Sequence, residues 1–134
     1  NDCDISEKEV NMAIFNGTND QINPYNGGLV SLLGNDSRGE VLSSEESYKY
    51  WRDLSFFEEE NFKILPERDK NLNSSVTKKD VIGSKIVALY TLVNGGHIYA
   101  SPNVKYSSFF GGNVNDINTA EEIYKIFENL KIKN

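Results

Sequence analysis

The chain has 134 residues, a formal net charge of −6 and 38% hydrophobic residues, as expected of one globular domain with its own core. The isoelectric point near 4.8 argues against the clustered Lys and Arg of a nucleic-acid surface, and it disfavours binding to an anionic membrane surface. We therefore expect a single domain over residues 1–134 and no nucleic-acid partner.

The first segment predicts a helix from Asp4 to Phe15, because Ile5, Val10 and Ile14 lie on or near one helical face. Asn16-Gly17 follows, and glycine there suits a helix C-terminus. The chain starts inside this pattern without a methionine, and it contains neither a signal peptide nor a run of about 20 apolar residues. We expect that it was processed or truncated from a longer protein.

A turn-rich loop from Asn19 to Gly39 leads to a second predicted helix, from Glu45 to about Phe57. Ser43 and Glu46 have the spacing of a capping box, in which each side chain binds the backbone N–H of the other residue. Behind this cap, an apolar stripe recurs at helical spacing. Its members Trp51 and Leu54 are predicted core residues.

The next segments predict a long loop and then an antiparallel sheet. Leu65 to Asp80 has little apolar content, which is typical of a loop. Ser84 to Val93 is rich in β-branched and aromatic residues, and Asn94-Gly95-Gly96 would turn it back onto His97 to Ala100 as a hairpin. Val104 to Phe110 alternates like a third strand.

The chain ends with a predicted helix that Thr119 and Glu122 would cap as a second capping box. Its apolar stripe includes Ile123 and Phe127, which we expect to pack on the sheet. The predicted fold class is therefore α+β, with an N-terminal helix and additional helices on a small antiparallel sheet.

Two segments resemble the globular part of bacterial prepilin-type proteins. The first runs from Gly34 to Ile64 and joins a glycine-punctuated Asx loop to a serine-capped helix with the pair Trp51 and Leu54. The second, Asn118 to about Lys131, is similar to the helix near the C-terminus of that family, although the usual Asp-Asp-Gly that follows it is absent.

The resemblance implies a pilin-like domain that lacks its N-terminal hydrophobic segment. The expected function is that of a structural subunit, a major or minor pilin or pseudopilin, in a bacterial surface filament or secretion pseudopilus. Its partners would be other pilin subunits, together with the inner membrane, which anchors the missing segment before assembly. We expect Ile5, Val10 and Ile14 to pack on the sheet or on neighbouring subunits, with Trp51, Leu54, Ile123 and Phe127 in the core.

The residues suggest no organised catalytic centre, so we expect no enzyme. His97 is the only histidine and Cys3 the only cysteine, too few for a zinc site or a Cys–His–Asn arrangement. We interpret His97 as a half-exposed residue at the edge of a hairpin. A small hydrolase that uses Asp36 or Glu45 is the third functional hypothesis.

We expect no cofactor, with calcium as the one metal to test. Asn113, Asn115 and Asp116 form an oxygen-rich loop in a place where some pseudopilins carry calcium. Asx turns that lead into the last helix explain the same residues and are the preferred interpretation. The alternative function from another class is a secreted or periplasmic ligand-binding domain without catalysis.

Overall fold

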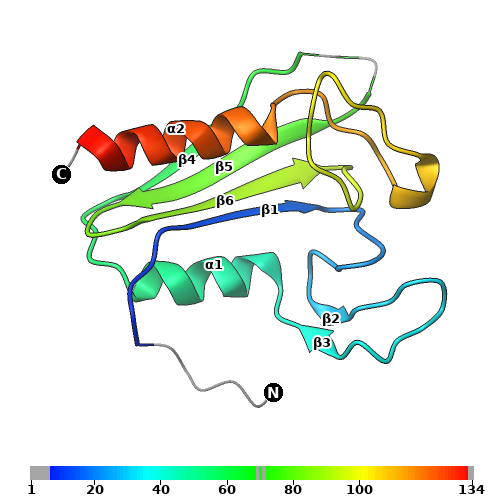
Figure 1. Ribbon diagram of the computed structural model, residues 1–134, viewed down its shortest axis with the longest axis horizontal. Helices are drawn as coiled ribbons and strands as arrows, with labels where there is room; N and C mark the ends of the chain where they lie inside the picture. The colour runs from blue at the N-terminus through cyan, green and yellow to red at the C-terminus, as the bar shows by residue number, and fades with distance from the viewer. Residues whose placement is uncertain (1–6, 69, 71, 133–134) are drawn as a thin grey trace.

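The computed structural model describes residues 7–68, 70 and 72–132, and its main element is a four-stranded sheet (Figure 1). The strand order is β1 (Met12–Gly17), β6 (Ile86–Val93), β5 (Ser75–Ile82) and β4 (Glu60–Ile64). β5 is antiparallel to both of its neighbours, whereas β1 is parallel to β6. The sheet is mixed, and the prediction of an antiparallel sheet is wrong.

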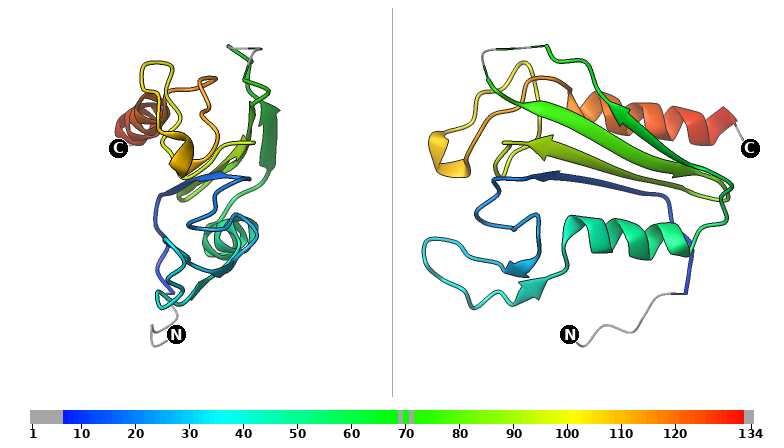
Figure 2. Two further views of the ribbon diagram at one scale, coloured as in Figure 1. Left: turned by 90° about the vertical axis from the view of Figure 1, so that its right-hand side faces the viewer. Right: turned by 180° about the vertical axis from the view of Figure 1, so that it is seen from behind.

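Two helices lie on opposite faces of this sheet, as the end-on view in Figure 2 shows. α1 (Ser44–Asp53) covers β1 and β6 on one face, and α2 (Thr119–Ile132) covers the other face. The short strands β2 (Gly28–Leu29) and β3 (Glu40–Val41) form a separate ribbon. A 3₁₀ turn, η1 (Ser108–Phe110), lies in the loop before α2. The fold is thus mostly β, and the predicted class of helices packed on a pilin-like sheet is wrong.

The predicted N-terminal helix is the largest error, because Met12–Gly17 forms β1. Its four consecutive apolar residues, Met12 to Phe15, fit a strand with two covered faces as well as a helix. Ala13 and Phe15 contact the core under α2, whereas Met12 and Ile14 contact the core under α1. Val10 lies before the strand and is partly buried, and Ile5 lies outside the described residues.

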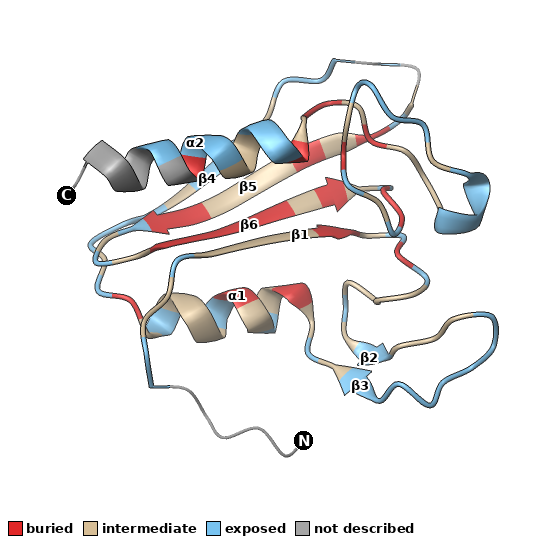
Figure 3. Ribbon diagram, in the orientation of Figure 1, coloured by how far each residue is buried: buried red, intermediate tan, exposed pale blue. Residues whose placement is uncertain are grey.

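The core lies on both faces of β6, whose residues Ile86 to Tyr90 are all buried (Figure 3). Alternate residues of the strand serve two clusters. Val87 and Leu89 pack with Tyr48 of α1, and Tyr90 and Leu92 pack with the segment around α2. A central strand with both faces covered explains why this run is continuously apolar.

The segment predicted as a loop between Leu65 and Asp80 contains most of β5. Lys78 and Asp80 lie in this strand, and their charges lower its apparent hydrophobicity, so the sequence pattern does not predict a strand. They form an ion pair at 2.8 Å, and the Lys78 ammonium also lies 5.4 Å from the ring centre of Tyr90. Mutual pairing thus lets two charged residues occupy the face that α2 covers.

The predicted hairpin and third strand are also wrong. β6 pairs with β1 instead of turning onto His97 to Ala100, and that segment has no regular structure. Asn94 does adopt the left-handed conformation, with φ of 59°, so the turn forms but leads out of the sheet. Val104 to Phe110 is a loop that ends in η1.

The first cap is confirmed. The backbone N–H of Glu46 donates to Ser43 Oγ at 3.1 Å, and the Glu46 carboxylate accepts from the backbone N–H of Ser43 at 3.0 Å. Trp51 packs against the buried cluster around Tyr48, and Leu54, just past the last turn, is partly buried. The helix ends at Asp53 rather than near Phe57.

The C-terminal helix is confirmed, but its predicted cap is wrong by one residue. Asn118 Oδ1 accepts from the backbone N–H of Ala120 at 3.1 Å, whereas Thr119 Oγ1 is buried without a hydrogen-bond partner. Glu122 instead accepts from the Tyr90 hydroxyl at 3.0 Å. Ile123 is partly buried, and the side chain of Phe127 lies outside the described part of the chain.

Candidate functional site

A cavity of about 300 Å³ lies where the parallel strands β1 and β6 end, next to the irregular segment that follows β6. The carboxyl ends of parallel strands are a common place for ligand sites, because the chain diverges there and leaves a crevice. The lining combines four aromatic rings with an imidazole, a carboxylate and two amides. The residues are Phe15, Asn16, Gly17, Asp20, Asn23, Gly96, His97, Ile98, Tyr99, Tyr106 and Phe110.

His97 and Asp20 form the polar centre of this cavity. Asp20 Oδ2 lies 2.9 Å from His97 Nδ1, and Asp20 Oδ1 accepts from the backbone N–H groups of Ile22 at 2.9 Å and Asn23 at 2.8 Å. The Asp20 side chain is only 4% exposed, whereas that of His97 is 47% exposed. The carboxylate is therefore buried and held by backbone N–H groups, whereas the imidazole is half exposed to solvent.

This contact determines which imidazole nitrogen can meet a ligand. An ionised carboxylate only accepts hydrogen bonds, so His97 Nδ1 carries the proton that Asp20 accepts. Nε2 of the neutral ring is then an acceptor that points away from the pair. The arrangement resembles the base and orienting carboxylate of a catalytic triad in its geometry, without the third member.

Glycines bring the two walls of the cavity together. A Cβ at Gly17 would lie 2.2 Å from the Gly95 carbonyl oxygen, and one at Gly96 would lie 1.9 Å from the carbonyl oxygen of Phe110. The close approach lets the His97 N–H donate to that same Phe110 oxygen at 2.6 Å. Only glycine allows the backbone after β6 to lie between these neighbours.

The aromatic wall is held by backbone contacts. Asn113 bonds the backbone of Tyr106 in both directions, with its Oδ1 accepting at 2.7 Å and its Nδ2 donating at 3.1 Å. The rings of Tyr106 and Phe110 meet edge to face, 6.5 Å between centres. Tyr99 is 68% exposed and Phe110 is 37% exposed, so both rings remain accessible to a ligand.

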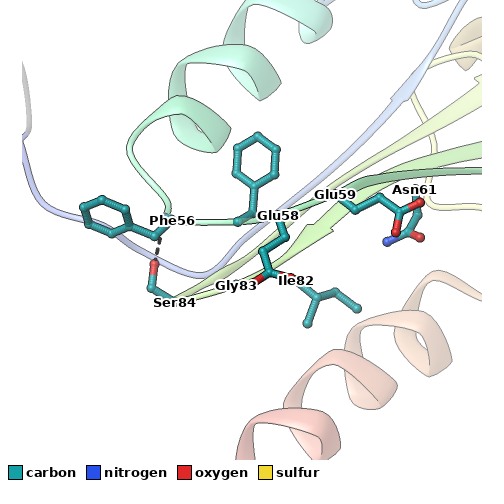
Figure 4. A pocket seen from close by; sticks show the side chains of 8 residues that line it. Phe56, Glu58, Glu59, Asn61, Ile82, Gly83 and Ser84 are labelled. Atoms are coloured by element: carbon teal, nitrogen blue, oxygen red, sulfur yellow. Dashed lines mark hydrogen bonds between the residues drawn. The ribbon is translucent and has the colours of Figure 1, made fainter.

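A second concave region lies at the opposite end of the sheet, near the turn between β5 and β6. It is an open groove of about 540 Å³, and Figure 4 shows Ser84 next to Phe56, whose backbone N–H donates to Ser84 Oγ at 3.0 Å. Its carboxylates, Glu58 and Glu59, are exposed. Because water already solvates them, they gain less from a ligand than a buried group does.

The structure separates the residues proposed for a hydrolase. Asp36 is exposed in the loop between β2 and β3. Glu45, in the first turn of α1, forms an ion pair at 2.8 Å with Lys79 of β5. These carboxylates do not form a common centre.

The calcium candidates also have separate roles. Asn113 holds Tyr106, while Asp116 is buried and accepts from the Arg68 backbone N–H and the Ser74 hydroxyl, both at 2.8 Å. Asn115 is partly buried. Within residues 7–68, 70 and 72–132, no group of three or more His, Cys, Asp or Glu could hold a metal ion.

Sequence reasoning missed Asp20 and the cavity. His97 is half exposed, as interpreted, but 77 residues separate it from Asp20, and no local pattern joins the two. The only sequence signal is the pair of flexible turns, Asn16-Gly17 and Gly95-Gly96, whose close approach glycine allows.

The chain matches no protein-family model, and comparisons with curated proteins and with solved structures give no significant match. In the part of the chain that the structure describes, neither helix has the length and apolar character needed to cross a bilayer. Function must therefore be argued from the cavity itself.

Proposed function

We propose that this chain is a ligand-binding domain without catalysis, and that its binding site is the cavity at the ends of β1 and β6. The observation that carries the proposal is the His97–Asp20 pair, which presents an oriented imidazole inside a cavity with aromatic walls. Small-molecule sites commonly combine apolar walls with a few fixed polar groups.

The composition of the cavity supports binding rather than reaction. Its described lining contains no serine, threonine, cysteine or lysine, so the imidazole has no conventional side-chain nucleophile to activate there. The same imidazole is well placed to receive one hydrogen bond from a ligand. Two of the rings, Tyr99 and Phe110, would cover the ligand's apolar surface.

The test is a fragment screen read by amide chemical shifts. A set of neutral, cationic and anionic one-ring compounds is titrated into the ¹⁵N-labelled protein at millimolar concentrations. Binding at the cavity shifts the amides of Gly17, Gly96 and His97, and Phe110→Ala weakens it. A screen in which no compound shifts these amides would refute the proposal.

A filament subunit is the second candidate. In its favour, the serine-capped helix that carries the prepilin resemblance is formed, and Trp51 packs against the sheet. Against it, Met12–Gly17 is a strand, so a continuous helix from an upstream membrane segment through Phe15 is absent. The upstream gene sequence tests this candidate, which requires a short basic leader, a cleavage site and about 20 apolar residues.

A further inference from the structure

The ligand class follows from the charge and hydrogen-bond polarity of the cavity, and this inference rests on the proposed function. We infer that the site selects small organic amines, in which a protonated nitrogen is attached to a single apolar ring. Three features of the cavity support this choice: the acceptor that His97 offers, the charge of Asp20 and the exposed rings.

The hydrogen-bond polarity comes from Asp20. Because its carboxylate accepts from His97 Nδ1 at 2.9 Å, the neutral ring presents Nε2 as an acceptor. A ligand that meets this nitrogen must therefore bring a donor. An ammonium donates, whereas a carboxylate at the same place would oppose the lone pair of Nε2.

The charge of the cavity also favours a cationic ligand. Among the described lining residues, Asp20 is the only one that is charged when His97 is neutral. Backbone N–H groups solvate its carboxylate, but no lysine or arginine of the lining cancels its charge. A cation beyond the imidazole would be attracted to this carboxylate, which is only 4% exposed and is therefore screened less than a surface charge.

The aromatic walls are compatible with the same ligand. The faces of Tyr and Phe rings attract ammonium groups, and here Tyr99 and Phe110 are both exposed at the cavity. The volume of about 300 Å³ corresponds to roughly ten water molecules of liquid. One ring with a short polar arm suits that space better than a larger ligand.

The experiment compares benzylamine, benzyl alcohol and benzoate, which share one ring and differ in the charge of the polar arm. Each is titrated at pH 8, where the amine is protonated and the carboxyl of benzoate is ionised. Shifts of the Gly17, Gly96 and His97 amides give the affinities. We expect benzylamine to bind about tenfold or more tightly than benzoate, a difference of about 1.4 kcal/mol.

Asp20→Asn is the decisive variant. The amide oxygen can still accept from the backbone of Ile22 and Asn23, while its NH₂ would now donate to His97 Nδ1. The proton then moves to Nε2, which becomes a donor, and the preference should reverse toward benzoate. An unchanged preference for benzylamine in Asp20→Asn would overturn the inference.

Tyr99→Leu provides a second test at a residue that is 68% exposed, so we expect the variant to fold. It should weaken benzylamine at least twofold and leave benzoate within that factor, because only the cation gains from the ring face. Equal losses for both compounds would count against the inference. Phe56→Leu, in the groove at the other end of the sheet, is the matched control and should change neither affinity.

The failure of this inference differs from the failure of the proposed function. If benzoate or benzyl alcohol binds as tightly as benzylamine in the unmodified protein, the amine preference is refuted and the binding site stands. If none of the three compounds shifts these amides while other fragments of the screen do, the amine preference is again refuted and the binding site again stands. If no fragment binds, both proposals fall.

Discussion

Replacing Tyr90 by Phe tests how α2 is held to the sheet. The Tyr90 hydroxyl donates to the Glu122 carboxylate at 3.0 Å, and the residue is only 1% exposed. Glu122 also accepts from Lys125 at 2.6 Å. A hydrogen bond to a charged group contributes about 1.5–3 kcal/mol. Because Lys125 remains and Glu122 is 15% exposed, we expect the lower end, about 1.5 kcal/mol, at pH 7.

The effect should depend on pH in one direction. Burial disfavours ionisation of Glu122, but the hydrogen bonds from Lys125 and Tyr90 outweigh it and lower the pKa of its carboxyl. A carboxyl with a lowered pKa stabilises the fold above its pKa in the unfolded chain, and this contribution is lost as pH falls through the folded value. The cost of Tyr90→Phe should therefore fall as pH drops through the folded pKa of Glu122, toward about half once the carboxyl is protonated and its bond to Tyr90 is neutral.

Urea unfolding of the original and variant proteins at pH 7 and at a series of lower pH values measures both effects. Near pH 7, the melting temperature should also fall by roughly 6 °C for a domain of this size. Tyr124→Phe on the same helix is the control, because Tyr124 is 61% exposed and should change the stability by less than about 0.5 kcal/mol. A cost of Tyr90→Phe that stays the same down to the lowest pH at which both proteins fold would refute the reasoning.

Three further predictions concern the cap residue Ser43, the tightly packed Gly17 and the buried carboxylate of Asp116. Ser43→Ala removes the acceptor for the Glu46 N–H and should cost about 1 kcal/mol in urea unfolding, with no loss of folded structure by circular dichroism. Gly17→Ala places a methyl group 2.2 Å from the Gly95 oxygen and should cost about 3 kcal/mol or more, since backbone on both sides must move; a cost below 1 kcal/mol would contradict the packing. Asp116→Ala leaves the Arg68 N–H and the Ser74 hydroxyl without their acceptor and should cost about 2 kcal/mol in urea unfolding. Calcium should not raise the melting temperature of the original protein, and a calcium-dependent rise would restore the metal hypothesis.

Local chemistry made some elements predictable. The capping box at Ser43 depends on residues three positions apart, so the sequence contains all of its parts. The apolar run Ile86 to Leu92 has a composition that only a covered strand or a buried helix accepts, and its β-branched residues favoured the strand. The cap is predictable because its contacts are local, and the strand is predictable because its residue types favour a covered strand.

Long-range pairing made the rest unpredictable. Residues Met12 to Phe15 are compatible with both a helix and a strand, and β6, which decides between them, lies more than 70 residues later. Lys78 and Asp80 lowered the apparent hydrophobicity of β5 because both are charged, and only the covering of this face by α2 shows that they lie in a packed strand. The candidate site depends on the same kind of contact, since Asp20 meets His97 only after β1 and β6 are side by side.

The parallel pairing of β1 with β6 has a consequence for biosynthesis. Among the described strands β1 pairs with β6 alone, so on the ribosome β1 must wait until Ile86–Val93 has emerged. Such distant closure is slow compared with the formation of local turns and helices. Until then the emerging chain exposes Met12 to Phe15 as an unpaired apolar segment, which chaperones can bind and which can aggregate.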